Sequence, residues 1–178
     1  EPFERVEVYF APYLVGGAVR DGLLGLVIRD YDVEIFGLPA ARLEPLLATH
    51  GRVDAVGQAF RVYKLSGVEG VPGALDVALP RRDSKVGPGH RGIAVEGDPD
   101  LSVAEASRRR DFTVNAMLFD PVTGEILDHW GGRRDLDARL LRAVDARTFG
   151  EDPLRALRAV QFAARYENAW GSELPALV

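Results

Sequence analysis

Short apolar segments, separated by glycines and charged residues, divide the chain into small alternating elements. Residues 13–15 predict a short strand that runs into Gly16-Gly17, and residues 18–24 then have helical composition. Further strands are predicted at 31–36, 60–65 and 75–79. The order of strand, glycine turn, helix and strand is the first structural unit that the pattern predicts.

Helical patterns follow between these strands and after them. Leucines at helical spacing predict a helix over 39–49. Ser102 with Glu105 three residues later is the pattern of a capping box, which predicts a helix start. A helical stretch around 112–118 and a short edge strand at 126–127 follow. Together the elements predict an α+β fold in which helices flank a small mixed sheet.

Residues 80–100 have a different composition, because prolines and glycines alternate there with charges. This composition favours a loop over a packed element, with the least order near 83–92. We therefore expect a mobile loop in this interval.

The last predicted helix begins after Asp152, which is suited to cap it, with Pro153 at the first helical position. Leu154, Leu157 and Val160 recur on one face of this helix. The pattern predicts the start of a second, helical region. We expect a head domain at 1–145 and the beginning of a helical neck domain at 146–178, truncated at Val178.

Composition limits the chemistry that the chain can perform. Apolar residues make up 47% and charged residues 28% of the chain, and no apolar run approaches the roughly 20 residues of a membrane span. Cysteine is absent and the three histidines lack ligand spacing, so any metal must be held by carboxylates. The amino terminus does not resemble a secretory signal, and we expect a cytoplasmic protein with no membrane partner. The oligomeric state is not predicted.

Three aspartates form the candidate catalytic set. Asp30 and Asp32 stand two residues apart in a strand-like segment, so their side chains share one face. Such a pair can bridge hard cations, although the same spacing is common at a solvated strand edge. Asp76 lies in an otherwise apolar strand, where an unpaired carboxylate would be costly to bury. Either a cation pairs with Asp76, or Asp76 faces water at the edge of a sheet.

The turn at Gly16 and Gly17 is the candidate triphosphate cradle. Glycines let the backbone approach an anion closely at the start of a helix, and Arg20 follows in the first turns. The chain carries 22 basic residues, and many of its arginines occur in groups. Arginine is the bidentate partner of phosphates, although a solvated helix face or a structural turn would give the same local pattern.

Four motifs follow one another along the chain. The first covers Gly16 to Asp21 and extends to the acidic pair Asp30-Tyr31-Asp32. The second is Arg109-Arg110-Asp111, and the third runs from Gly132 through Asp135-Leu136 to Leu141-Arg142. The fourth is Glu151-Asp152-Pro153-Leu154-Arg155, followed by Arg158. In this order the motifs resemble those of the class II tRNA nucleotidyltransferases and the bacterial poly(A) polymerases, and ordered motifs are far more specific than any one of them.

The resemblance implies a polymerase-β-like head that holds two Mg²⁺ ions with Asp30 and Asp32, followed by the start of an all-α neck. The implied reaction is template-independent transfer of CMP or AMP from CTP or ATP to the 3′ end of tRNA, with Asp76 as a third carboxylate. The resemblance also implies that Arg20, Arg110, Asp111 and Arg158 contact the ribose or phosphates of the nucleotide.

Asp152 and Arg155 are the candidate base readers. A carboxylate acceptor beside a fork of donors complements the amino group and ring nitrogen that cytosine and adenine share. Guanine and uracil place a carbonyl where that amino group lies, which would leave the aspartate unpaired. Asp152 is at the same time suited to be a plain helix cap.

Several alternatives share these patterns. An enzyme that adds only CC or only A, or a poly(A) polymerase, would carry the same head. A non-catalytic RNA-binding domain is the alternative from another class, and the three aspartates argue against it.

Overall fold

The computed structural model describes residues 10–56, 62–85, 93–149, 152, 154–170 and 176–177. Its main sheet contains, among these residues, seven strands in the order β3-β4-β5-β2-β1-β8-β9. The strands of this sheet are β1 (Ala11–Val15), β2 (Tyr31–Phe36), β3 (Arg52–Val56), β4 (Val62–Ser66), β5 (Ala74–Ala78), β8 (Leu118–Phe119) and β9 (Ile126–Leu127). Strands β2 and β5 pair in parallel and the other neighbours are antiparallel. The predicted mixed sheet is confirmed.

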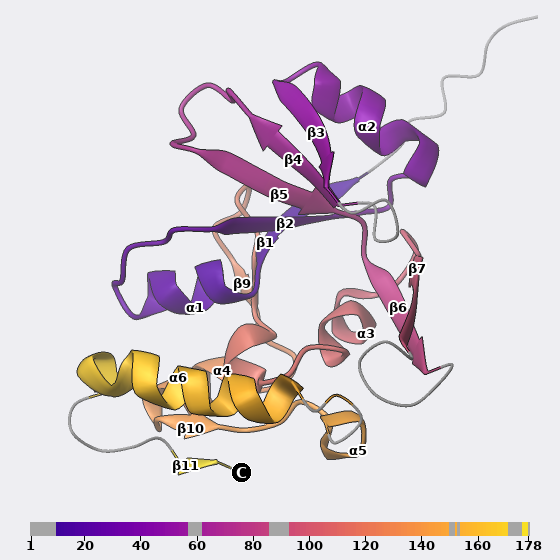
Figure 1. Ribbon diagram of the computed structural model, residues 1–178. Coiled ribbons are helices and arrows are strands. Elements are labelled where there is room, and N and C mark those ends of the chain that lie inside the picture. The colour runs from indigo at the N-terminus through magenta and orange to yellow at the C-terminus, as the bar shows by residue number, and fades with distance from the viewer. Residues whose placement is uncertain are drawn as a thin grey trace, which may run out of the picture.

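Helix α2 (Ala40–Ala48) covers one face of the sheet (Figure 1). The residues that it covers alternate along the strands, as the period of two in a strand requires. Val33 on β2 lies beside Val77 on β5, and Leu65 on β4 lies beside Leu75 on β5. These side chains pack with Leu43 and Leu47 of α2. The strands at 31–36 and 75–79 and the helix at 39–49 were therefore predicted correctly to within one residue.

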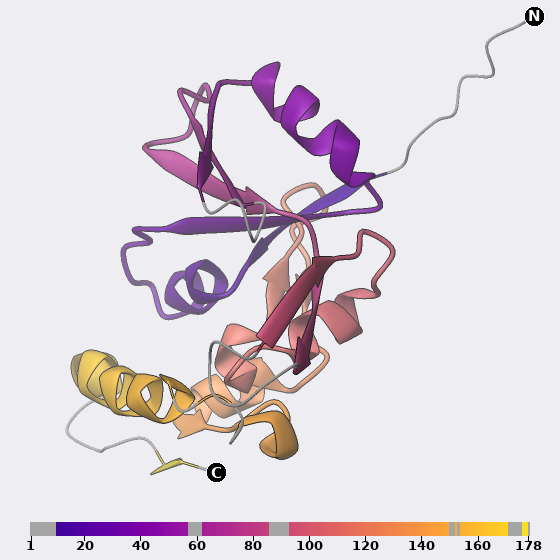
Figure 2. The same ribbon diagram turned by 45° about the vertical axis from the view of Figure 1, so that its right-hand side comes forward.

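The remaining helices lie on the other side of the sheet (Figures 1 and 2). They are α1 (Gly17–Leu23), α3 (Val103–Arg108), the short 3₁₀ helix η2 (Thr113–Asn115), α4 (Gly132–Asp137), α5 (Ala146–Phe149) and α6 (Leu154–Trp170). A second core joins Val19 of α1, Phe112 before η2, Leu136 of α4 and Ala159 of α6. A pair of short strands, β10 (Leu140–Leu141) and β11 (Ala176–Leu177), lies beside this layer.

The loop expected at 80–100 is in part wrong. Strands β6 (Arg81–Lys85) and β7 (Ile93–Gly97) form an antiparallel hairpin, while residues 86–92 lie outside the described residues. Strand β6 is mostly charged and β7 follows several glycines, so the composition of the interval favoured a loop. Strand β3, at the exposed edge of the main sheet, was also missed.

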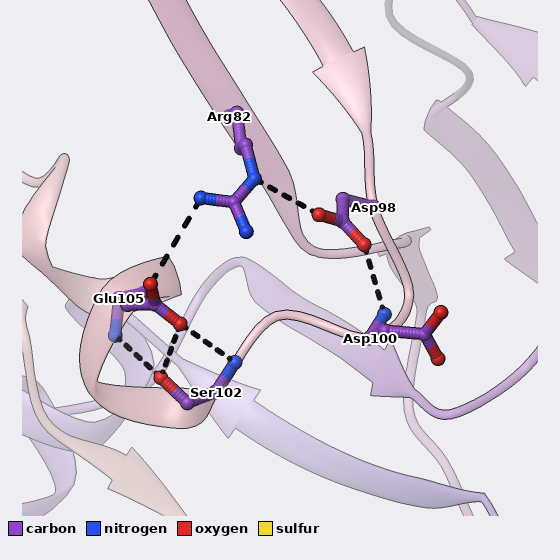
Figure 3. Close-up of polar contacts among 5 residues, drawn as sticks. All are labelled: Arg82, Asp98, Asp100, Ser102 and Glu105. Atoms are coloured by element: carbon purple, nitrogen blue, oxygen red, sulfur yellow. Dashed lines mark hydrogen bonds and ion pairs between the residues drawn. The ribbon is translucent and has the colours of Figure 1, made fainter.

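Charged contacts attach the hairpin to α3 (Figure 3). Arg82 Nε donates to Asp98 Oδ2 at 2.9 Å, and its Nη1 lies 3.9 Å from Glu105 Oε1. Glu105 belongs to the predicted capping box, which is confirmed: its backbone N–H donates to Ser102 Oγ at 3.2 Å. The hydrogen bond from Ser102 lowers the pKa of Glu105. The hairpin is thus tied to the helix that leads into Arg109-Arg110-Asp111.

One other prediction needs correction. The helical stretch expected at 112–118 is only the 3₁₀ turn η2, followed by β8. The predicted helix after Asp152 is present as α6, and its apolar face is exposed: Leu157 is 62% and Val160 69% exposed, whereas Ala159 is only 7% exposed. Helical period alone does not tell which side of a helix meets a core.

Candidate active site

The two aspartates Asp32 and Asp76 lie side by side, although 43 positions separate them in the sequence. They are direct partners in the parallel pairing of β2 with β5, so they share the face that α2 does not cover. Lys64 is the partner of Asp76 on β4, and Asp54 is the partner of Lys64 on β3. A row of four charged residues therefore crosses the sheet on this face.

Electrostatic crowding marks Asp32. Limited hydration raises the pKa of its carboxyl, Arg110 opposes this rise, and the negative charges of Asp76, Asp30 and Glu34 add to it. Asp30 is solvent-exposed, immediately before β2. The three predicted acids thus share one electrostatic environment, in which a cation would be stabilised.

Lys64 is a cation that sequence analysis did not identify. Its Nζ lies 2.9 Å from Asp76 Oδ1, and the hydrogen bond to Asp76 raises the pKa of the lysine, with smaller contributions from Asp30 and Asp32. Its signal in the sequence was weak, because a lysine in an alternating strand is usually a plain solvent-facing residue. Asp76 therefore pairs with a cation. This is one of the two interpretations that the sequence left open, the other being an aspartate that faces water at a sheet edge.

The Gly16 turn lies against Arg110 and Asp32. Gly16 has a φ of 70°, and a Cβ there would lie 2.9 Å from Arg110 Nη1 and 3.7 Å from Asp32 Oδ2. A side chain at this position would therefore displace the guanidinium of Arg110. Gly17 begins α1, and a Cβ there would lie 3.1 Å from Arg20 Nη2. The predicted glycine turn, arginine and acid meet at one place.

Arg109 and Arg110 both donate to Oε1 of Glu34, the second residue that sequence analysis missed. The distance from Arg110 Nη2 is 2.9 Å. Glu34 lies two residues after Asp32 on β2, so it shares the face of Asp32, and it is 4% exposed. The signal that could have found it is this spacing, since Asp30, Asp32 and Glu34 follow one another at every second position of the sequence.

Arg20 lies in a buried network rather than at the surface. It forms an ion pair with Asp21, with Nη2 and Oδ1 2.8 Å apart, and Nη1 donates to Asn115 Oδ1. Asn115 Nδ2 in turn donates to Asp111 Oδ1 at 2.9 Å, and Arg158 Nη2 lies 3.0 Å from Asp111 Oδ2. Arg20, Asp111 and Arg158 are thus brought together. In this arrangement they connect α1, η2 and α6.

Asp152 and Arg155 lie at the start of α6. Asp152 Oδ1 accepts the backbone N–H of Leu154 at 3.0 Å, which confirms the predicted helix cap. Arg155 Nη2 donates to the backbone carbonyl of Arg109 at 2.6 Å, while Arg155 Nη1 is buried without a hydrogen-bond partner in the part of the chain that the structure describes. The fourth motif therefore contacts the second.

Within the described ranges, no group of three or more acidic or histidine side chains forms a ready metal site. The carboxylates of Asp32 and Asp76 lie at paired positions of neighbouring strands. Among the same residues, none of the helices combines the length and apolar character needed to cross a bilayer.

Known proteins resemble the chain over most of its length. It is 44% identical to the multifunctional CCA protein of Aromatoleum aromaticum over 158 residues, which cover 88% of this chain and 35% of that protein. The crystal structure of the Bacillus stearothermophilus CCA-adding enzyme in complex with CTP matches with a TM-score of 0.68 and 33% identity, over 95% of this chain and 37% of that one. The Thermotoga maritima CCA-adding enzyme complexed with tRNA matches with a TM-score of 0.66 and 30% identity, over 90% and 35% of the two chains.

The chain spans about a third of the length of the curated relatives it matches. The model of the poly A polymerase head domain matches residues 12–142. This range contains the glycine turn, the three aspartates and the Arg109-Arg110-Asp111 motif, whereas Asp152, Arg155 and Arg158 lie beyond it. Because the match covers well over half of the chain and includes the acidic site on the open face of the sheet, the chain belongs to the family of poly A polymerase head domains.

Proposed function

We propose that this chain is the catalytic head of a tRNA nucleotidyltransferase that adds CMP and AMP, from CTP and ATP, to the 3′ end of tRNA without a template. The observation that carries the proposal is the pairing of Asp32 with Asp76 on an open face, beside the Gly16 turn and Arg110. The relatives named above, one with CTP and one with tRNA, support the choice of substrates.

The carboxylate oxygens at this site fit Mg²⁺. We propose that Asp30 and Asp32 hold two Mg²⁺ ions. Mg²⁺ takes oxygen ligands, usually one or two carboxylates together with substrate phosphates. The acids around Asp32 provide such oxygens. Burial, and to a smaller extent repulsion by these acids, disfavours the charged form of Asp32 until a cation arrives. When bound, two such ions would stabilise the attacking and the leaving oxygens.

The reaction is an in-line displacement at the α-phosphorus of the nucleotide. The 3′-hydroxyl oxygen of tRNA forms the new P–O bond. The bond between the α-phosphorus and the oxygen that bridges to the β-phosphate breaks, and pyrophosphate leaves. Asp76 accepts the hydroxyl proton in this proposal. Lys64, at 2.9 Å from Asp76, orients that carboxylate.

The nucleotide lies, in this proposal, between the glycine turn and α6. The backbone of Gly16 and Gly17 and the guanidinium of Arg110 contact the triphosphate. Asp152 and Arg155 read the base edge, while Arg20, Asp111 and Arg158 hold the ribose side of the pocket. The buried Nη1 of Arg155 supports this arrangement, because a buried donor is stabilised by an acceptor on the ligand.

We also propose a head domain at 1–145 and the start of a helical neck at 146–178. The end of the family match at residue 142 and the start of α5 at Ala146 support this boundary. A cytoplasmic setting stays part of the proposal, supported by the absence of cysteine and by the RNA substrate.

The test is an extension assay with the full-length protein that carries this chain. Transcripts of tRNA that end before, within and after CCA are each supplied with one nucleotide at a time, and the products are sequenced. Stepwise addition of C, C and A is expected. Addition of only C or only A, or of a long A tract, would identify the specialist enzymes or the poly(A) polymerase instead. Binding of tRNA without any addition would favour the RNA-binding domain.

A further inference from the structure

Glu34 is a buried acid that the reaction above does not use. It lies on β2 between Asp32 and Phe36, and only 4% of its surface is exposed. A buried carboxylate is costly unless it is paired and hydrogen-bonded. Glu34 meets this requirement with one oxygen, Oε1, which accepts from both Arg109 and Arg110.

The two arginines lead from Glu34 to different parts of the candidate site. Arg110 uses Nη2 for Glu34, and its Nη1 lies against the Gly16 turn. Its Nε is a buried donor without a hydrogen-bond partner among the residues that the structure describes. Glu34 therefore holds the guanidinium of Arg110 through Nη2, while Nη1 lies beside Gly16.

Arg109 makes the second connection. Its side chain donates to Glu34, and its backbone carbonyl accepts from Arg155 Nη2 at 2.6 Å. Glu34 thus fixes the residue on which the candidate base reader Arg155 rests. The strand that carries the metal ligands is linked to α6 through one carboxylate.

Asp32 gives a physical reason for such an anchor. Asp32 Oδ2 and Arg110 Nη1 both lie within 4 Å of one point, the position that a Gly16 side chain would take. An arginine that nothing else held would pair with this carboxylate and occupy a metal ligand. Glu34, two residues farther along β2, supplies the competing negative charge.

We propose that Glu34 is a positioning residue of the nucleotidyltransferase site, and this inference rests on the function proposed above. Glu34 holds Arg110 where its guanidinium meets the triphosphate. Through Arg109, it also holds Arg155 at the base. Glu34 itself touches neither the nucleotide nor the metal ions.

A double-mutant cycle with E34Q and R110Q tests the inference in the full-length protein. CMP incorporation into a tRNA that lacks CCA is measured over a range of CTP concentrations. E34Q should raise KM for CTP about tenfold, as expected when a charge-assisted contact loses its orientation. In the R110Q background the same change should alter KM less than about twofold, because the residue that Glu34 positions is already gone. Equal factors in both backgrounds, or an unchanged KM in E34Q, would overturn the inference.

Two controls separate a positioning role from a general loss of structure. E69Q removes an exposed acid in the turn between β4 and β5, and its KM should equal that of the unmodified protein. E34D keeps the carboxylate one methylene shorter and should restore part of the affinity for CTP. If E34Q does not fold, the cycle is run with E34D and R110K, and independent effects of these two changes would again refute the coupling.

Failure of the proposed function gives a different result. In that case the unmodified protein adds no CMP to a tRNA that lacks CCA. Direct titration of CTP onto the unmodified protein and onto E34Q then decides the inference alone. Weaker CTP binding by E34Q supports the positioning role, and equal binding refutes it.

Discussion

Strands β4, β5 and β2 have two faces that differ in nearly every physical respect. On one face Val33, Leu65 and Val77 are packed under α2. On the other face, at the neighbouring positions, Asp32, Asp76 and Lys64 form a charged row that α2 does not reach. The first face stabilises the fold by excluding water. The second face concentrates negative charge around Asp32, which a bound cation would stabilise. Mutations should therefore separate stability from activity according to the face that they change.

The largest expected effect is that of Asp32→Asn. Nucleotide addition should fall by at least about a hundredfold, because a metal ligand contributes several kcal/mol to transition-state stabilisation. The folded protein should not lose stability. The pKa of Asp32 is raised above its ordinary value of 3.8, so ionisation opposes folding, and stability falls as the pH rises through the window from 3.8 to the raised pKa.

Addition assays and thermal unfolding without Mg²⁺, at pH 7 and at pH 4, check both parts. The melting temperature of D32N at pH 7 should equal or exceed that of the unmodified protein. Asp54→Asn, in the same row at the edge strand, is the matched control and should leave addition unchanged. Unimpaired addition by D32N, or a clearly lower melting temperature, would contradict the assignment of Asp32.

On the packed face, Leu43→Ala should lower the free energy of unfolding by about 2–5 kcal/mol, since it removes a fully buried side chain of α2. The rate of addition per folded molecule should stay the same, because no residue of the charged row is touched. Urea unfolding measures the first quantity, and the addition assay below the melting temperature measures the second. Val122→Ala, at an exposed position, should change stability by less than about 0.5 kcal/mol.

Gly16→Ala should weaken CTP binding about tenfold, because the added methyl displaces Arg110. The backbone of Gly16, with a φ of 70° and a ψ of −133°, should also make alanine cost about 1–3 kcal/mol of stability. Gly124→Ala is the matched control: Gly124 has a φ of 75°, yet nothing lies within 4 Å of an added Cβ. It should show the loss of stability with unchanged CTP binding. A similar loss of CTP binding in both variants would attribute the Gly16 effect to backbone strain alone.

The smallest expected effect concerns Lys64. Lys64→Met removes a positive charge next to the acids, so Mn²⁺, used as a spectroscopic substitute for Mg²⁺, should bind about threefold more tightly. Arg52→Met, which breaks an exposed ion pair with Asp54 on the edge strand, should leave Mn²⁺ binding unchanged. Titration by electron paramagnetic resonance measures both. Weaker Mn²⁺ binding by K64M would mean that Lys64 helps to form the metal site.

The described strands and helices differ in how well local sequence predicted them. Strands β2 and β5 carry apolar residues at alternate positions, and α2 carries leucines at helical spacing, so these elements were predicted correctly. The hairpin of β6 and β7 was not, because β6 is mostly charged and β7 follows a glycine-rich interval. The attachment of the hairpin through Arg82 depends on Asp98 and Glu105. A strand that is stabilised mainly by its partners leaves little periodic signal.

The sequence by itself determined which residues share a face. The spacing of Asp30 and Asp32 predicted that the two acids lie close together, and the motifs around Arg110 and Asp152 indicated the family. Only the tertiary structure decided that Asp32 lies beside Asp76, that Lys64 answers Asp76, and that Glu34 holds two arginines. The reason is physical. Side-chain alternation depends only on neighbouring residues, whereas strand pairing and ion pairing join segments that are far apart in the sequence, and the local sequence of one segment does not show which other segment it will contact.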